Sequence, residues 1–237
     1  MTRFRNIQNN LISLARYNIR IVFGGKFIYF IAASVIFFLA IGTIMAFDEN
    51  YLSAEDVYGL LIFPAVLLVF YPSAFGIQND ADQRTLEIIF GIPDYRYKVW
   101  LVRLFMVMVI VYICLFPLAF IAHYALVSIP IFKMVSQIMV LALFTATLGF
   151  CVSTIVKNGN GTAVVMVVIG LIFLILTDEI RDSKWNVFLN PFDNPSNINE
   201  VIWMETIRQN RIILSISSVV FLLIGLLNLQ NREKFLR

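Results

Sequence analysis

Charged side chains are scarce in this chain. Only 14% of its 237 residues are Asp, Glu, Lys or Arg, whereas 60% are hydrophobic, and the mean hydropathy is +0.84. Soluble domains carry roughly 25% charged and 45 to 50% apolar residues. So few charges cannot cover a water-facing surface, which excludes a soluble globular enzyme. The net charge of +3 is also too small to indicate nucleic acid as a partner.

Residues that usually carry catalysis or bind metals are equally few, with one histidine and two cysteines. His123 stands beside Tyr124 at the outer end of an apolar run, where we interpret it as an interfacial anchor. Cys114 and Cys151 lie inside apolar runs and are expected to act as small hydrophobic residues. The sequence contains no His-Glu-x-x-His, Gly-x-Ser-x-Gly or Gly-x-x-x-x-Gly-Lys-Ser/Thr motif. We therefore expect no catalytic residue, no metal site and no cofactor on this chain.

What the sequence does contain is six long apolar runs, at 27–47, 57–77, 99–122, 135–156, 162–177 and 212–229. A hydrocarbon core of about 30 Å is spanned by about 20 helical residues. The runs predict an all-α polytopic membrane protein with a six-span domain over 27–230. Arg103 is the one ionisable residue inside a run, and its long stem allows the charge to snorkel to the interface. Because ion-coupled transporters place charges inside the membrane, this pattern disfavours ion-coupled transport.

The scarce charges predict an orientation. Six spans put the N-terminus, the segment 78–98, the turn at 157–161 and the C-terminus on one side of the membrane. That side carries 13 of the 18 basic residues and five acidic ones, a net of +8, and the other side carries a net of −5. Basic residues favour the cytoplasmic side. Both termini are therefore predicted to be cytoplasmic, in the cytoplasmic (inner) membrane of a cell.

Residues 1–26 precede the first span and carry arginines but no acidic residue. Apolar residues recur at intervals of three and four: Phe4, Ile7, Leu11 and Leu14. This spacing is typical of an amphipathic helix, which would lie on the cytoplasmic face of the lipid bilayer. The alternative is a disordered basic segment. At the other end, residues 231–237 are predicted to form a short cytoplasmic tail.

The loop at 78–98 between the second and third runs is the only sizeable cytoplasmic loop. Asp82 is a suitable N-cap for a short helix, which Gly91 and Pro93 would end. One face of this helix is apolar: Leu86, Ile89 and Phe90. Such a face either lies on the bilayer or fits a groove of a partner protein, and the residues alone favour neither.

The stretch from Asp82 to Leu104 resembles a region of the permease subunits of type-2 ABC exporters. It contains Thr-Leu-Glu, apolar residues, Gly, a further apolar residue and Pro, followed by a basic and aromatic entry into a long apolar run. In that family this region includes the coupling helix. The amphipathic N-terminal helix, the six spans, the element Asn190-Pro191-Phe192 and the basic tail are similar to the layout of the family.

The resemblance implies a docking surface for a separate ATP-binding subunit. The residues that would form it are Arg84, Thr85, Leu86, Glu87, Ile88, Ile89, Phe90, Gly91 and Pro93. Arg84 and Glu87 would make polar contacts at its rim, although both are also read as ordinary solvated charges. Two copies of the ATP-binding subunit would hold ATP and Mg²⁺. A second permease chain, identical or different, would complete the exporter.

Residues 178–211 form the largest loop of the opposite, external side. In the family this region holds short re-entrant or interfacial helices that close the outer mouth. The gate residues would be Trp185, Phe188, Pro191 and Phe192. The residues alone favour a different role, because Trp185, Phe188, Phe192 and Trp203 have the character of an interfacial aromatic belt.

Two alternatives to an exporter permease of this class remain. One is a permease similar to the haem exporter of cytochrome c maturation, which is also small and has six spans. The other is a membrane scaffold or assembly factor that transports nothing. A scaffold would have no need of the sequence between Asp82 and Lys98, and we therefore favour the permease.

Overall fold

The computed structural model describes residues 27–47, 52–82, 96–193, 195 and 198–229. Over these residues the chain is helical, with no strand. The elements are α2 (Phe27–Phe47), α3 (Ala54–Asp82), the short π-helix η1 (Arg96–Leu101), α5 (Val102–Ala125), α6 (Ile131–Val156), α7 (Gly159–Glu179) and α8 (Glu200–Asn228). Six of the described helices are long and apolar enough to cross a membrane. This confirms the predicted all-α, six-span fold of a multi-pass membrane protein.

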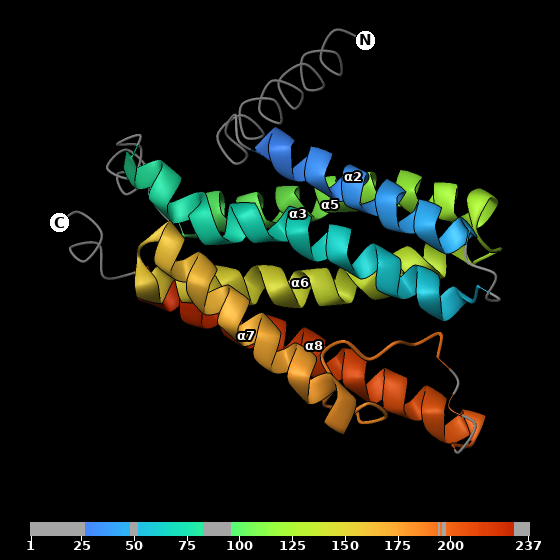
Figure 1. The fold of residues 1–237 in the computed structure, drawn as a ribbon. Helices are drawn as coiled ribbons and strands as arrows, with labels where there is room; N and C mark the ends of the chain where they lie inside the picture. The colour runs from blue at the N-terminus through green and yellow to red at the C-terminus, as the bar shows by residue number, and fades with distance from the viewer. Residues whose placement is uncertain (1–26, 48–51, 83–95, 194, 196–197, 230–237) are drawn as a thin grey trace, which may run out of the picture.

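The helices run side by side in an elongated bundle, with α2 and α5 at one flank and α7 and α8 at the other (Figure 1). Helices α3 and α6 lie in the centre. In the apolar stretches of α6 and α3, 72% and 61% of the residues are buried, compared with 17% in α2 and in α7. The central pair therefore forms the core, and the outer helices present most of their apolar side chains outward.

The core between α3 and α6 is built from side chains spaced about one helical turn apart. Leu61 and Ala65 of α3 and Ile138 and Ala142 of α6 are fully buried in one cluster. Further along, α6 carries Gly149, where a Cβ atom would lie 2.8 Å from the Cβ of Ser73 in α3. Small residues at such points let helix backbones approach closely in membrane proteins.

A two-residue turn joins α6 to α7. Lys157 ends α6 in the left-handed conformation, with φ of 60°. Asn158 then caps α7, because its Oδ1 accepts hydrogen bonds from the backbone N–H groups of Asn160 at 2.9 Å and Gly161 at 3.3 Å. The chain thus reverses direction within one short connection.

The first residue of α7 touches α3. The backbone N–H of Gly159 donates a hydrogen bond to Oε1 of Gln78. A Cβ atom at Gly159 would lie only 2.6 Å from Cδ1 of Phe75. Glycine is required here because any side chain would push the start of α7 away from α3.

The helix bounds differ from the predicted runs mainly at two places. Helix α3 continues beyond the predicted run as far as Asp82, and the described residues resume at Arg96, so the role of Asp82 as an N-cap of the next helix stays a prediction. The first residue beyond the run, Gln78, accepts the hydrogen bond from Gly159. The predicted amphipathic helix at 1–26, the predicted coupling helix and the tail at 231–237 lie outside the described residues.

Helix α8 begins at Glu200, well before the apolar run at 212–229. Asn199 caps it by accepting a hydrogen bond from the N–H of Val201 at 2.9 Å. Its polar first half is helical because one face is buried, with Trp203, Asn210 and Leu214 at intervals of a turn or two. A search for uninterrupted apolar runs does not detect such a half-polar helix.

Candidate functional site

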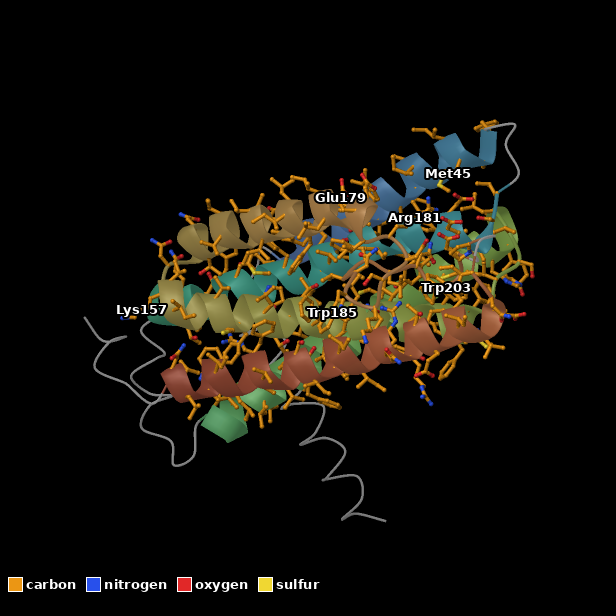
Figure 2. The ribbon with its side chains drawn as sticks, turned by 90° about the horizontal axis from the view of Figure 1, so that it is seen from below. Met45, Lys157, Glu179, Arg181, Trp185 and Trp203 are labelled. Carbon is orange, nitrogen blue, oxygen red and sulfur yellow. The ribbon has the colours of Figure 1, made fainter. Side chains whose placement is uncertain are left out.

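The densest polar network of the described residues lies at one end of the bundle. Figure 2 shows Lys157 at one end and Arg181 and Trp203 toward the other; the two are called the Lys157 end and the Arg181 end below. At the Arg181 end, the chain leaves α7 and runs through residues 180–193, called the closing segment. A backbone carbonyl of α3 and two side chains of α8 hold this segment in place.

Two Asn-x-Phe turns shape the closing segment. Oδ1 of Asn186 accepts a hydrogen bond from the N–H of Phe188, and Oδ1 of Asn190 accepts one from the N–H of Phe192, both at 3.0 Å. Asparagine favours such turns because its side chain can bond the backbone two residues on. Nδ2 of Asn190 also donates to the backbone oxygen of Glu55 in α3 at 3.0 Å. The second turn is thereby attached to the start of α3.

Arg211 of α8 is the centre of the network. Its Nε donates to Oε1 of Gln137 in α6 at 2.7 Å, and its Nη1 donates to Oδ1 of Asn210 at 3.2 Å. Its Nη2 donates to the hydroxyl of Tyr58 in α3 and to the backbone oxygen of Leu189, each at 3.0 Å. The Tyr58 side chain is fully buried. One guanidinium therefore joins three helices and the closing segment.

Asn210, the neighbour of Arg211, provides the second attachment to α8. It is 1% exposed, and its Nδ2 donates to the backbone oxygens of Lys184 at 2.9 Å and Asn186 at 2.7 Å. Two adjacent residues of α8 thus bind three backbone carbonyl groups of the closing segment. Buried carbonyl groups need such donors, because an unsatisfied one costs about 1 to 3 kcal/mol.

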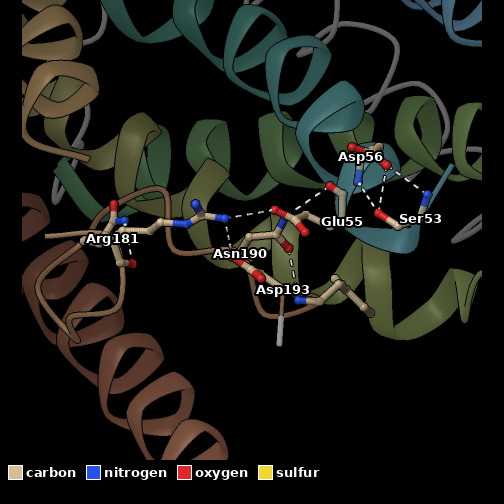
Figure 3. A network of polar contacts seen from close by, with 8 residues as sticks. Ser53, Glu55, Asp56, Arg181, Asn190 and Asp193 are labelled. Atoms are coloured by element: carbon tan, nitrogen blue, oxygen red, sulfur yellow. Dashed lines mark hydrogen bonds and ion pairs between the residues drawn. The ribbon is translucent and has the colours of Figure 1, made fainter. Parts of the chain in front are cut away.

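An ion-pair cluster covers the outer side of the closing segment (Figure 3). Nη2 of Arg181 lies 3.0 Å from Oδ2 of Asp193 and 3.6 Å from Oε1 of Glu55. Asp193 raises the pKa of Arg181 above its ordinary value, through its hydrogen bond and its negative charge. Glu55 is placed by the cap of α3, where Ser53 donates its N–H and its hydroxyl to Oδ2 of Asp56, both at 2.8 Å. The Arg181 side chain is 65% exposed, so these pairs orient the segment but add little stability.

A polar cavity of about 250 Å³ lies beneath this cluster. It is lined by Glu55, Asp178, Arg181 and Asp193 together with asparagine side chains and the ring of Phe188. Its volume suits several water molecules or a small polar solute, since a water occupies about 30 Å³ in the liquid. In the described part of the chain, no three His, Cys, Asp or Glu residues are grouped as a metal site.

The structure brings three of the four predicted gate residues into the attached part of the closing segment. Phe188 lines the polar cavity, and Phe192 packs on the core with its ring centroid 5.7 Å from that of Tyr58. Pro191 lies between them, half-buried. Trp185 is 64% exposed and lies apart from this packing. Whether the three residues act as a gate stays a prediction.

Trp203 differs from the sequence-based interpretation. Its assignment to an exposed interfacial belt is wrong, because Trp203 is only 4% exposed. It occupies the buried face of the first half of α8 and lines the polar cavity. A tryptophan in a polar stretch of sequence resembles an interfacial one as long as the helix around it is not recognised.

The predicted docking residues Arg84 to Pro93 lie outside the described residues. Next to them along the chain, Trp100 and Arg103 are both buried. The guanidinium carbon of Arg103 lies 5.1 Å from the centre of the Trp100 ring, a cation–π contact that stabilises a desolvated cation. The Arg103 guanidinium thus lies against Trp100 of η1 within the bundle, and its snorkelling to the interface stays a prediction.

Tyr58, Gln137, Asn210 and Arg211 were not predicted as site residues. The sequence around Arg211 could have indicated its role, because this residue directly precedes the last apolar run and has no acidic residue within four positions. Such a cation at a membrane boundary needs partners from elsewhere in the fold. Tyr58 and Gln137 carried no signal, since each lies in or beside an apolar run.

No family model, curated protein or solved structure matches this chain. The polar network at the Arg181 end, together with helix α3 that takes part in it, is therefore the observation from which a function can be inferred.

Proposed function

We propose that this chain is the transmembrane permease subunit of a type-2 ABC exporter. In this proposal it moves a substrate across the cytoplasmic membrane, driven by ATP that a separate subunit binds. The observation that carries the proposal is the position of α3. One end of α3 leads directly into the residues that resemble a coupling helix. The other end carries Glu55 and Tyr58, which bind the closing segment and its anchor Arg211.

Helix α3 connects the two ends mechanically. Its 29 residues span about 42 Å at 1.5 Å per residue. It is packed in the centre of the bundle, so a force applied at Asp82 passes along a supported helix. Pro64 and Pro72 each remove one backbone hydrogen bond and are the places where such a helix bends. Movement of the coupling helix would then reach the contacts of Glu55 and Tyr58.

Opening of the path would require two groups of contacts to break. One joins Glu55 to the closing segment, through the hydrogen bond from Asn190 to the Glu55 carbonyl and the ion pair of Arg181 with the Glu55 carboxylate. The other is the bond from Arg211 to Tyr58. Both join α3 to partners at the Arg181 end. Phe188 and Phe192 are held by the same segment, so its release would displace these two aromatic rings together.

The charge distribution supports the proposed orientation of the bundle in the membrane. The net charge of +8 on one side and −5 on the other supports a cytoplasmic position for the Lys157 end, where ATP would be available. The Arg181 end would then be external. The proposed complex contains two ATP-binding subunits, which hold ATP and Mg²⁺, and a second permease chain beside this one.

The test is purification of the tagged full chain from its native membrane. We expect an ATPase with a Gly-x-x-x-x-Gly-Lys-Ser/Thr motif to co-purify with it. Ile89→Asp and Phe90→Asp should each reduce the recovered ATPase at least tenfold, because a buried carboxylate disrupts an apolar interface. Asn160→Asp is the matched control, since it adds the same charge at an exposed position of the Lys157 end.

Two outcomes would contradict the proposal. Purification of the intact chain with no ATP-binding subunit would favour the scaffold alternative. Recovery of the ATPase at the native level with Ile89→Asp and Phe90→Asp would show that residues 84–93 do not dock it.

A further inference from the structure

A groove of about 510 Å³ lies on the outer surface between α6 and α8, and no residue of the closing segment lines it. Its α8 wall consists of residues on one helical face, including Arg208, Arg211, Ile212, Ser215 and Ile216, and Gln137 of α6 closes it. The apolar side chains that line the groove are exposed: Ile212 by 51% and Ile216 by 59%. The groove therefore combines cationic and apolar surface.

Arg211 brings an uncompensated positive charge to this groove. Its four hydrogen-bond partners are a hydroxyl, two amide oxygens and a backbone carbonyl, all of them neutral. No carboxylate of the described residues pairs with it. These bonds use four of the five guanidinium hydrogens, and the remaining one is on Nη1.

Arg208 adds a second guanidinium one turn away. It pairs with Glu205 of the same helix at 2.8 Å, and its side chain is 71% exposed. Glu205 also accepts a hydrogen bond from Gln209, and it is the acidic residue nearest to the groove along α8. Two guanidinium groups against one carboxylate leave the site cationic. The hydroxyl of Ser215 lies one turn further on and makes no hydrogen bond to the described residues.

An apolar strip continues from this cationic site along α8. Ile212, Ile216, Val219, Leu223 and Leu227 are all between 51% and 59% exposed, and residues 212–228 include no ionisable side chain. From Ile212 to Leu227 the strip is about 22 Å long at 1.5 Å per residue. One leaflet of the hydrocarbon core is about 15 Å thick. The strip is therefore long enough to accompany an acyl chain.

We propose that the groove binds an anionic glycerophospholipid. The phosphate accepts hydrogen bonds from Nη1 of Arg211, the guanidinium of Arg208 and the hydroxyl of Ser215, and an acyl chain lies along Ile212 and Ile216. A lipid fits better than a soluble anion because the cationic site opens directly onto exposed apolar surface. Arg181 at the same end lacks this combination, since it pairs with Asp193 and Glu55. The proposal is independent of the transport function.

The experiment is native mass spectrometry of the purified full chain in a neutral detergent. Phosphatidylglycerol and phosphatidylcholine of equal chain length are titrated separately, and inorganic phosphate is added as a competitor. We expect about fivefold tighter binding of phosphatidylglycerol, since a basic residue near an anionic headgroup contributes about a factor of five. Arg208→Gln should remove this preference, Ser215→Asp should remove it by repulsion, and Glu205→Gln should increase it.

Arg181→Gln is the matched control, because it removes one exposed positive charge at the same end of the bundle but outside the groove. It should bind phosphatidylglycerol as the native chain does. Arg208 and Ser215 are exposed and Glu205 is partly exposed, so the three variants are expected to fold.

The proposal is overturned if Arg208→Gln and Ser215→Asp bind phosphatidylglycerol like the control. It is also overturned if inorganic phosphate displaces the lipid at millimolar concentration, which would indicate a site for soluble anions. A lipid-free dimer that dissociates in Ser215→Asp would assign the groove to a second copy of this chain instead.

Discussion

At the scale of single residues, Arg211 accounts for the largest share of polar contacts at the Arg181 end. It supplies donors to a buried tyrosine hydroxyl, a glutamine, an asparagine and a backbone carbonyl. A hydrogen bond from a charged donor contributes about 1.5 to 3 kcal/mol, and loss of a donor also leaves buried acceptors unsatisfied. Stability of the closing segment should therefore depend strongly on this one side chain.

Replacement of Arg211 tests this dependence. We expect Arg211→Gln to lower the free energy of unfolding by about 3 kcal/mol, because glutamine is too short to reach Tyr58 and Leu189. Thermal unfolding of the chain in lipid-free detergent measures the change. Arg208→Gln, one turn earlier on α8, should change stability by less than about 0.5 kcal/mol, since its ion pair is exposed. Equal losses for the two variants would show that the Arg211 network does not stabilise the bundle.

At the scale of helices, the close contact between the start of α7 and α3 depends on Gly159. We expect Gly159→Ala to destabilise the chain by about 1 to 3 kcal/mol, because its Cβ would collide with the ring of Phe75. Gly170 in the middle of α7 is the matched control, since a Cβ atom there would meet no other atom within 4 Å. Gly170→Ala should stabilise by about 0.5 to 1 kcal/mol, as expected inside a helix. The two melting temperatures should therefore shift in opposite directions, and a shift in the same direction would refute the close contact.

Most of the helices could be predicted from the sequence, because each apolar run has to be helical in a membrane. Helix α2 has the bounds of its run. The first half of α8 was missed, since its polar residues interrupt the run while one face remains buried. The partners of Arg211 could not be predicted from the sequence either. Tyr58 and Gln137 are 153 and 74 residues away in sequence, and apolar periodicity does not indicate which helices become neighbours.

The two Asn-x-Phe turns are an intermediate case. Their turn chemistry is local and follows from asparagine, so Asn186 and Asn190 could have been recognised as turn residues. Their attachment to Glu55 and to Asn210 depends on the packing of α3 and α8. Local sequence therefore indicates the shape of the closing segment, and only the fold determines where it is held.

At the scale of the whole molecule, the proposed orientation can be measured directly. In a chain with Cys114 and Cys151 replaced by alanine, we expect Lys184→Cys to react with a membrane-impermeant maleimide added to intact cells. Asn160→Cys should react only after the membrane is permeabilised. Both native side chains are exposed, so the difference reports the side of the membrane rather than burial. The reverse labelling pattern would contradict the cytoplasmic assignment of the Lys157 end.

The two-residue connection between α6 and α7 has a consequence for biogenesis. Only Lys157 and Asn158 separate the two helices, so their facing ends stay close together throughout insertion. We expect the two to insert as one helical hairpin, whose tip is joined to α3 by the bond from Gly159 to Gln78. Since α3 is synthesised first, it can serve as the template on which this hairpin docks during translation.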